Sequence, residues 1–78
     1  MDQEKEIIQS IAEHLGLNPE DLDRQASLKE ELSLGPIELN DLLHTLSVKF
    51  GVSFKGEDLK ELATVEDIIV LVEDNLLD

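Results

Sequence analysis

Apolar side chains near the middle of the chain recur with the period of an α-helix, and this pattern restricts the fold more than any other feature. They occupy positions i, i+3, i+4, i+7 and i+11 of one helix face: Leu39, Leu42, Leu43, Leu46 and Phe50. Proline suits the first position of a helix, and glycine suits the position after its last. Pro36 and Gly51 therefore bound a predicted helix over residues 36–50, and its apolar stripe must pack against other elements.

Three further segments carry helix signals. A helix is predicted over residues 3–15, followed by Gly16, and its apolar stripe consists of Ile7, Ile8, Ile11 and Leu15. A short helix is predicted over residues 56–62, with Leu59 and Leu62 facing inward. The last helix should begin after Thr64, which forms a capping box with Asp67, and its inward face carries Val65, Ile68, Ile69, Val72 and Leu76.

Brief helical turns are expected in the long segment between the first two long helices. Asn18 can cap a turn that starts at Pro19, and Ser27 and Glu30 have the spacing of a capping box. These turns are expected to bring four leucines to the core: Leu17, Leu22, Leu28 and Leu32. After the middle helix, Val52 and Phe54 should fold onto the core as loop residues, because no second strand exists to pair with them.

These elements predict an all-α fold in a single domain, residues 1–78, with three longer helices and one short helix in a small bundle. Only two residues are aromatic, so the core must be aliphatic. The chain has no cysteine, which excludes disulfides and zinc–thiolate sites. No apolar run approaches the ~20 residues of a membrane span, and the acidic N-terminus is unlike a signal peptide, which favours a cytoplasmic location.

The charge is strongly acidic, with 19 acidic and six basic residues and a net charge of −13. The basic residues are dispersed, so binding to the nucleic-acid backbone is not expected. A protein with a basic surface patch is the expected partner, although the charge alone would also suit a mimic of nucleic acid.

The segment ELSLGPIELNDLLHTLSVKF resembles, without a gap, the motif region of the acyl carrier protein family, which is similar to D-L-G-L-D-S-L followed by an acidic-apolar helix ending in Phe. The matching apolar positions are Leu32, Leu34, Ile37, Leu42, Leu46 and Phe50. Upstream, EHLGLNPEDLDRQASLKEEL resembles the loop of that family, and downstream LATVEDII resembles the start of its last helix. The resemblance covers nearly the whole chain and implies a helical carrier-like domain.

The resemblance departs from the family at its centre. The serine that carries 4′-phosphopantetheine in the family falls on Pro36, and the aspartate before it falls on Gly35. Proline has no hydroxyl, so no phosphodiester can form there, and no cofactor is expected. Ser33 is the alternative attachment residue, but using it requires three extra residues before the apolar stripe.

In the family, basic patches on partner enzymes bind the acidic second helix, so the resemblance implies contacts at Glu38 and Asp41. His44 lies beside them and is added as a third candidate for partner binding. Farther along the same helix, Ser47, Val48 and Lys49 replace the usual acids.

Both histidines are isolated in sequence, no motif predicts a metal or catalytic site, and the acidic segment from residue 21 lacks the glycine and glutamate of a calcium loop. An enzyme is therefore not expected. The leading hypothesis is a binding module that docks on a partner, such as an acyl-chain enzyme, as a scaffold or regulator. Two alternatives stay open: a working acyl carrier of fatty-acid or related biosynthesis modified at Ser33, and a protein that holds acyl chains non-covalently in its leucine-rich core.

Overall fold

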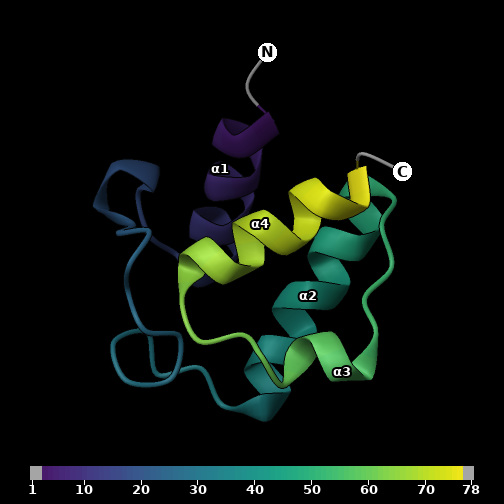
Figure 1. Cartoon of the computed structure of the whole chain (residues 1–78). Helices are drawn as coiled ribbons and strands as arrows, with labels where there is room; N and C mark the ends of the chain where they lie inside the picture. The colour runs from purple at the N-terminus through teal and green to yellow at the C-terminus, as the bar shows by residue number, and fades with distance from the viewer. Residues whose placement is uncertain (1–2, 77–78) are drawn as a thin grey trace.

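The computed structural model describes residues 3–76 and contains three long helices, one short helix and one turn of 3-10 helix. Their bounds are α1 Gln3–Leu15, η1 Pro19–Asp21, α2 Pro36–Phe50, α3 Gly56–Leu59 and α4 Val65–Leu76 (Figure 1). The predicted all-α fold of three longer helices and one short helix is confirmed. No helix in the described part is long and apolar enough to cross a membrane.

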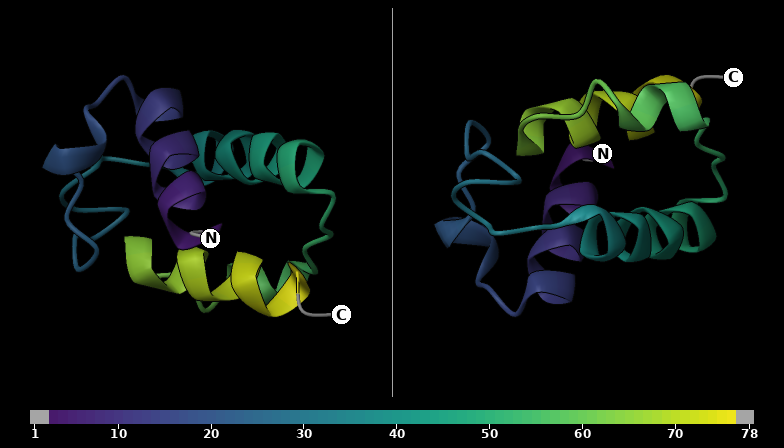
Figure 2. Two further views of the ribbon diagram at one scale, coloured as in Figure 1. Left: turned by 90° about the horizontal axis from the view of Figure 1, so that it is seen from above. Right: turned by 90° about the horizontal axis from the view of Figure 1, so that it is seen from below.

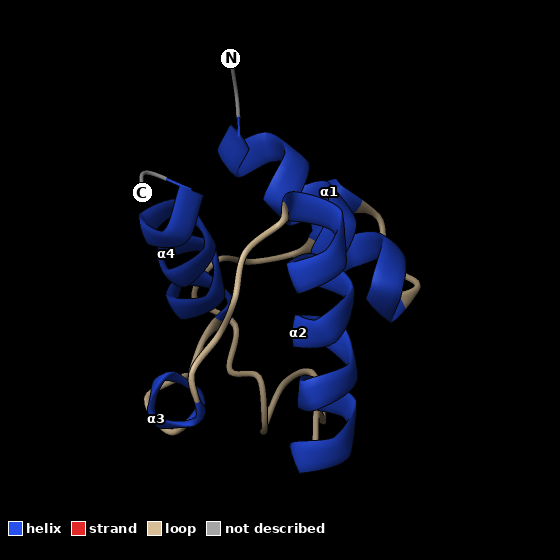
Figure 3. Ribbon diagram, turned by 90° about the vertical axis from the view of Figure 1, so that its right-hand side faces the viewer, coloured by secondary structure: helices blue, strands red, loops and turns tan. Residues whose placement is uncertain are grey.

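The first helix packs against both other long helices. α1 contacts α2 and α4, and α2 and α4 contact each other more sparsely. The long loop between α1 and α2 covers one end of this arrangement (Figure 2), and α3 lies across from α2 (Figure 3). The beginning of α2 therefore faces the long loop on one side and the segment that starts at Leu59 on the other.

The core is built from the predicted apolar stripes of the three long helices. Its largest fully buried side chains are all aliphatic: Ile7, Ile11, Leu42, Leu46, Val65, Ile68, Ile69 and Val72. Phe50, the last residue of α2, is only partly buried at its edge. In the loop that follows, Val52 is buried and Phe54 partly buried, as expected for loop residues folded onto the core. These apolar stripes face one another, so each helix buries its own stripe by packing against the other helices.

Glycines end two of the long helices, as the sequence predicts. Gly16 and Gly51 have φ angles of 74° and 67°, in the left-handed region that glycine adopts without steric cost. After α1, the Leu17 N–H donates to the Ala12 carbonyl at 2.8 Å, which closes a Schellman turn. At the start of α4, the predicted capping box is present, because Thr64 N–H donates to Asp67 Oδ2 at 3.1 Å and Asp67 N–H donates to Thr64 Oγ1 at 3.3 Å.

Two expectations about side chains in the long loop are wrong. Leu17 is 39% exposed, because it follows the left-handed Gly16 and leaves the helix pointing outward. The Asn18 side chain accepts no bond from the backbone of η1, and its amide instead donates to the Asp21 carboxylate at 3.3 Å. The backbone carbonyl of Asn18 does accept, from Asp21 N–H at 2.9 Å. Leu22 and Leu28 are buried as expected, and Leu32 is partly buried.

The Ser27 box is shifted by one residue. The Ser27 hydroxyl accepts from Glu30 N–H at 3.1 Å, but the carboxylate that accepts from Ser27 N–H at 3.1 Å belongs to Glu31. No helix follows, and the segment continues as turns.

The short helix α3 ends at Leu59 rather than at the predicted Leu62, since the following residues make bonds of the i→i+3 type. The turn after α3 places the Ala63 carbonyl where it accepts from Leu28 N–H at 2.9 Å.

An arginine ties the long loop to two helices. Arg24 Nε donates to Glu66 on α4 at 2.6 Å, and its Nη1 donates to Glu4 on α1. The hydrogen bond to Glu66, followed by the bond to Glu4, raises the pKa of the Arg24 guanidinium, although burial opposes the shift. The backbone carbonyl of Arg24 also accepts from Glu66 N–H at 2.8 Å. The loop is thus fixed to the start of α4 by side-chain and backbone bonds.

Candidate functional site

Pro36 is the first residue of α2, at the end of the helix that faces α3 and the long loop. A proline at this position sacrifices no helical hydrogen bond, because the first N–H groups of a helix have no intrahelical partner. Gly35 precedes it in an extended conformation, and its carbonyl accepts the first helical bond, from Leu39 N–H at 2.9 Å. The pair Gly35–Pro36 therefore starts the helix as the sequence predicts.

Glu38 has a structural contact that the sequence analysis missed. Its Oε1 accepts from Gly35 N–H at 3.0 Å. This is one of the two hydrogen bonds of a capping box, and the only one that glycine can make, because the other needs a side-chain acceptor at Gly35. A Cβ atom built on Gly35 would lie only 2.8 Å from the same Oε1, so a larger residue here would require the Glu38 carboxylate to move. Glu38 is exposed, yet its carboxylate is already engaged with the helix start.

Ser33 lies outside the helix. It is exposed and has a φ of 56°, an uncommon left-handed conformation for a residue other than glycine. The neighbouring Leu34 N–H donates to the Leu28 carbonyl at 2.8 Å, which anchors this turn to the long loop. Its hydroxyl is thus presented from a loop, three residues before the first residue of α2.

The other two candidates for partner binding lie on the exposed side of α2. Asp41 Oδ2 is 3.3 Å from His14 Nε2, so this carboxylate also links α2 to the end of α1, and His14 is not isolated in the fold. His44 is exposed and follows Asp41 by three positions. Unlike Asp41, it has no bond to another side chain among those found within residues 3–76.

Two apolar side chains on the same helix are exposed, which the sequence analysis did not predict. Ile37 is 80% exposed and Val48 is 71% exposed. With Asp41 and His44 they occupy positions i, i+4, i+7 and i+11, so all four share one face of α2, which we call the outer face. The same periodicity count that located the buried stripe could have located this second stripe.

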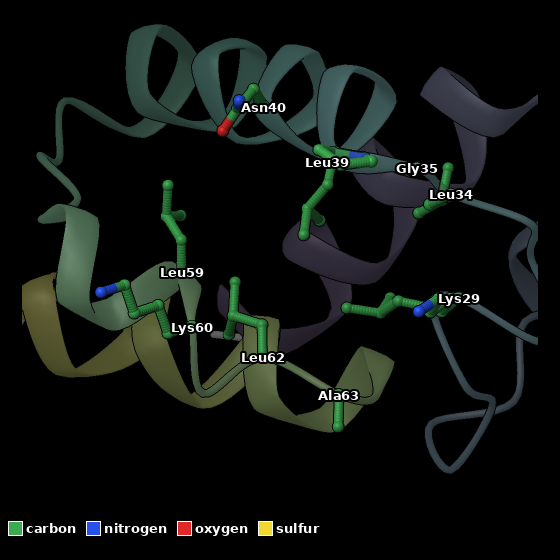
Figure 4. A pocket seen from close by; sticks show the side chains of 11 residues that line it. Lys29, Leu34, Gly35, Leu39, Asn40, Leu59, Lys60, Leu62 and Ala63 are labelled. Carbon is green, nitrogen blue, oxygen red and sulfur yellow. The ribbon is translucent and has the colours of Figure 1, made fainter.

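A groove of about 420 Å³ lies between the start of α2, α3 and the long loop. Its walls are mainly aliphatic, with contributions from Leu28, Leu34, Pro36, Leu39, Leu59 and Leu62. In Figure 4, Leu39 points into the groove from α2, and Leu59 and Leu62 point into it from the opposite wall. Its size is within the usual range of small-molecule sites, about 300–1,000 Å³.

The charged residues of this groove are all basic. Eleven residues line it, and they include Lys29 and Lys60 but neither aspartate nor glutamate. The two lysines lie on opposite sides of the groove (Figure 4). In a chain with 19 acidic and six basic residues, this local excess of positive charge is the reverse of the overall balance.

Within residues 3–76, no three histidine or acidic side chains come close enough together to hold a metal ion. The candidate site thus consists of the start of α2, its outer face and the adjoining groove.

Comparison with known proteins supplies the family context. The family described as "Phosphopantetheine attachment site" matches residues 5–72. The chain is 31% identical to the acyl carrier protein of Chlamydia trachomatis serovar L2, over 96% of this chain and 97% of that protein. It is also 31% identical to the acyl carrier protein of Chlamydia muridarum, over 95% and 96% of the two chains. The acyl carrier protein of an Exiguobacterium strain is 28% identical, over 91% and 90%.

Proposed function

Because the chain belongs to the phosphopantetheine-attachment family that includes the acyl carrier proteins, we propose that it is a carrier-like binding module without a prosthetic group. Members of this family carry acyl groups and do not catalyse reactions. The module docks on a partner as a scaffold or regulator instead of delivering a thioester.

Pro36 carries this proposal. It is the first residue of α2, and the ungapped sequence resemblance aligns it with the serine of the family. Esterification by a phosphopantetheinyl transferase requires a hydroxyl, which proline lacks. Ser33 has a hydroxyl, but it lies in a left-handed turn three residues before the helix, so it would present an arm from a different place.

The outer face of α2 is the proposed docking surface. It combines the carboxylate of Asp41 and the imidazole of His44 with the exposed Ile37 and Val48, and Glu38 lies at its edge. A partner with a basic patch around an apolar centre fits this composition, because charges at the rim steer association while apolar contacts hold the complex. Acyl-chain enzymes that bind carrier proteins are the class we propose.

The first prediction concerns modification. When the wild-type chain is coexpressed with a phosphopantetheinyl transferase, its intact mass should remain that of the unmodified polypeptide. An acyl carrier protein from one of the relatives, produced in the same cells, is the positive control. A mass increase that disappears in Ser33→Ala would contradict the proposal and show a working carrier modified at Ser33.

The second prediction concerns docking. A purified fatty-acid-synthesis enzyme with a basic carrier-docking patch should bind the wild-type chain and compete with a true carrier for it. The double variant Glu38→Gln/Asp41→Asn should bind about three- to tenfold more weakly, because rim charges contribute modestly to affinity. Titration by calorimetry at low and physiological salt measures this difference.

The matched control removes the same number of charges elsewhere. Glu20 and Glu57 are exposed and lie on η1 and α3, outside α2. Glu20→Gln/Glu57→Gln should change the affinity less than twofold. Equal weakening in both double variants would mean that net charge, and not the outer face of α2, governs binding.

A further inference from the structure

Two opposite charges border the outer face of α2, one near each end of the helix. Glu38 lies in the first turn and Lys49 in the last, and both side chains are exposed. They are 11 positions apart, so they lie on the same side of the helix, about 16 Å apart along its axis. Asp41 belongs to the first half, and no acidic residue follows it before Gly51. The helix is therefore acidic at its start and basic at its end.

The apolar side chains of the outer face are also placed at its two ends. Ile37 is 80% exposed and Val48 is 71% exposed, which makes them the most exposed large apolar side chains within residues 3–76. Each precedes one of the two charges by a single position. A second protein that covers this face would remove both of them from water. Each end of α2 thus presents one apolar side chain and one charge, and the sign of the charge differs between the ends.

The charge of Lys49 is not paired within the part of the chain that the structure describes. The three ion pairs found there involve His14 and Arg24 as the basic partners. A lysine in the last turn suits the dipole of the helix, which favours positive charge at that end. It also restricts which surfaces can cover Val48, because a cation brought against Lys49 would be repelled. Only an acidic or neutral surface is suited to this end of the helix.

We propose that the partner of the outer face has a bipolar docking surface, by which we mean one that is basic at one end and acidic at the other. Its basic group faces Glu38 and Asp41, its acidic group faces Lys49, and an apolar contact accompanies each. This inference rests on the proposed docking function and narrows the class of partner. Lys49 orients the partner along α2 and discriminates against surfaces that are basic throughout, because like charges across an interface oppose binding.

The experiment uses a fatty-acid-synthesis enzyme whose structure with its own carrier is known and whose patch is basic along the whole docking helix. Superposing α2 on that helix identifies the enzyme cation that would face Lys49. Changing this cation to glutamate should strengthen binding of the wild-type chain about three- to tenfold, because repulsion becomes attraction. Lys49→Glu should strengthen binding to the unchanged enzyme by a similar factor. Combining both changes should return the affinity to about the wild-type level, as measured by calorimetry at low salt.

The matched control makes the same charge change outside α2. Lys5 is exposed on α1, and Lys5→Glu alters the net charge by the same amount as Lys49→Glu. It should change the affinity for the unchanged enzyme less than twofold. Unfolding curves of both variants separate an effect on the helix dipole from an effect on binding, because only the former changes the stability of the free protein.

Two results would overturn the inference while leaving the proposed function standing. These are equal binding of the two enzyme forms by the wild-type chain, and equal gains from Lys49→Glu and Lys5→Glu. If neither enzyme form binds the wild-type chain or the Lys49→Glu variant, the proposed docking function fails, and the inference that rests on it fails as well. The two kinds of failure are therefore distinguishable.

Discussion

Replacing Gly35 with aspartate and Pro36 with serine should convert the protein into a substrate for phosphopantetheinyl transferase. The serine would lie at the first position of α2, where the side chain of Pro36 is exposed. The aspartate side chain would crowd Glu38 Oε1, because a Cβ on Gly35 lies 2.8 Å from it. Glu38 is exposed and flexible, so it can swing away, and the new carboxylate can then cap the helix by accepting from its N–H groups.

The intact mass after coexpression with the transferase measures the modified fraction. None of the wild-type protein should be modified, and most of the double variant should be. Gly35→Asp alone is the control, since it alters the charge and the cap without adding a hydroxyl, and it should remain unmodified. Making the double change in a Ser33→Ala background excludes modification at Ser33. An unmodified double variant that is still folded would mean that more than the hydroxyl separates this chain from a working carrier.

Leu46→Ala should bring the protein close to unfolding. Leu46 is fully buried on α2, in the core that α2 shares with α1 and α4. Leucine-to-alanine changes in cores cost about 2–5 kcal/mol, because the removed methyl groups lose their burial and leave a cavity. A chain of 78 residues has a total stability of only about 4–12 kcal/mol, so this single change removes much of it.

Urea unfolding followed by circular dichroism measures the free energy of unfolding of this variant. The matched control is Val48→Ala on the same helix, where the side chain is 71% exposed. It should change the free energy by no more than about 0.5 kcal/mol, as surface substitutions usually do. Similar losses in the two variants would mean that the burial of Leu46 does not determine the stability of α2, because helix propensity alone favours alanine at both positions.

The helices could be predicted from the sequence because their signals are local. The apolar stripes recur every three or four residues, and the start of α2 at Pro36 and its end before Gly51 follow from the backbone preferences of those two residues. The capping box of Thr64 and Asp67 is likewise contained within four positions. Each of these signals depends only on residues that are close in the sequence, so it can be recognised without knowing the tertiary fold.

The contacts of the long loop could not be predicted in this way. Arg24 bonds to Glu66, which is 42 positions away in the sequence, and no local pattern identifies that partner. The contact between His14 and Asp41 is of the same kind, since it joins two helices whose relative placement depends on the whole core. The groove was missed for the same reason, because its walls come from three separate segments.

The two walls of the groove differ in how firmly they are attached to the rest of the fold, because the long loop is bonded to α4. The loop wall is bonded to α4 by the Arg24 side chain and by the backbone bond from Val65 to Ala26, and the bond from Leu28 to Ala63 joins it to the opposite wall. The opposite wall consists of Leu59, at the end of the four-residue α3, and of Lys60, Leu62 and Ala63 after it. Segments with few protecting contacts open at low free energy, so the backbone amides of α3 should exchange hydrogen with solvent faster than the bonded amide of Leu28.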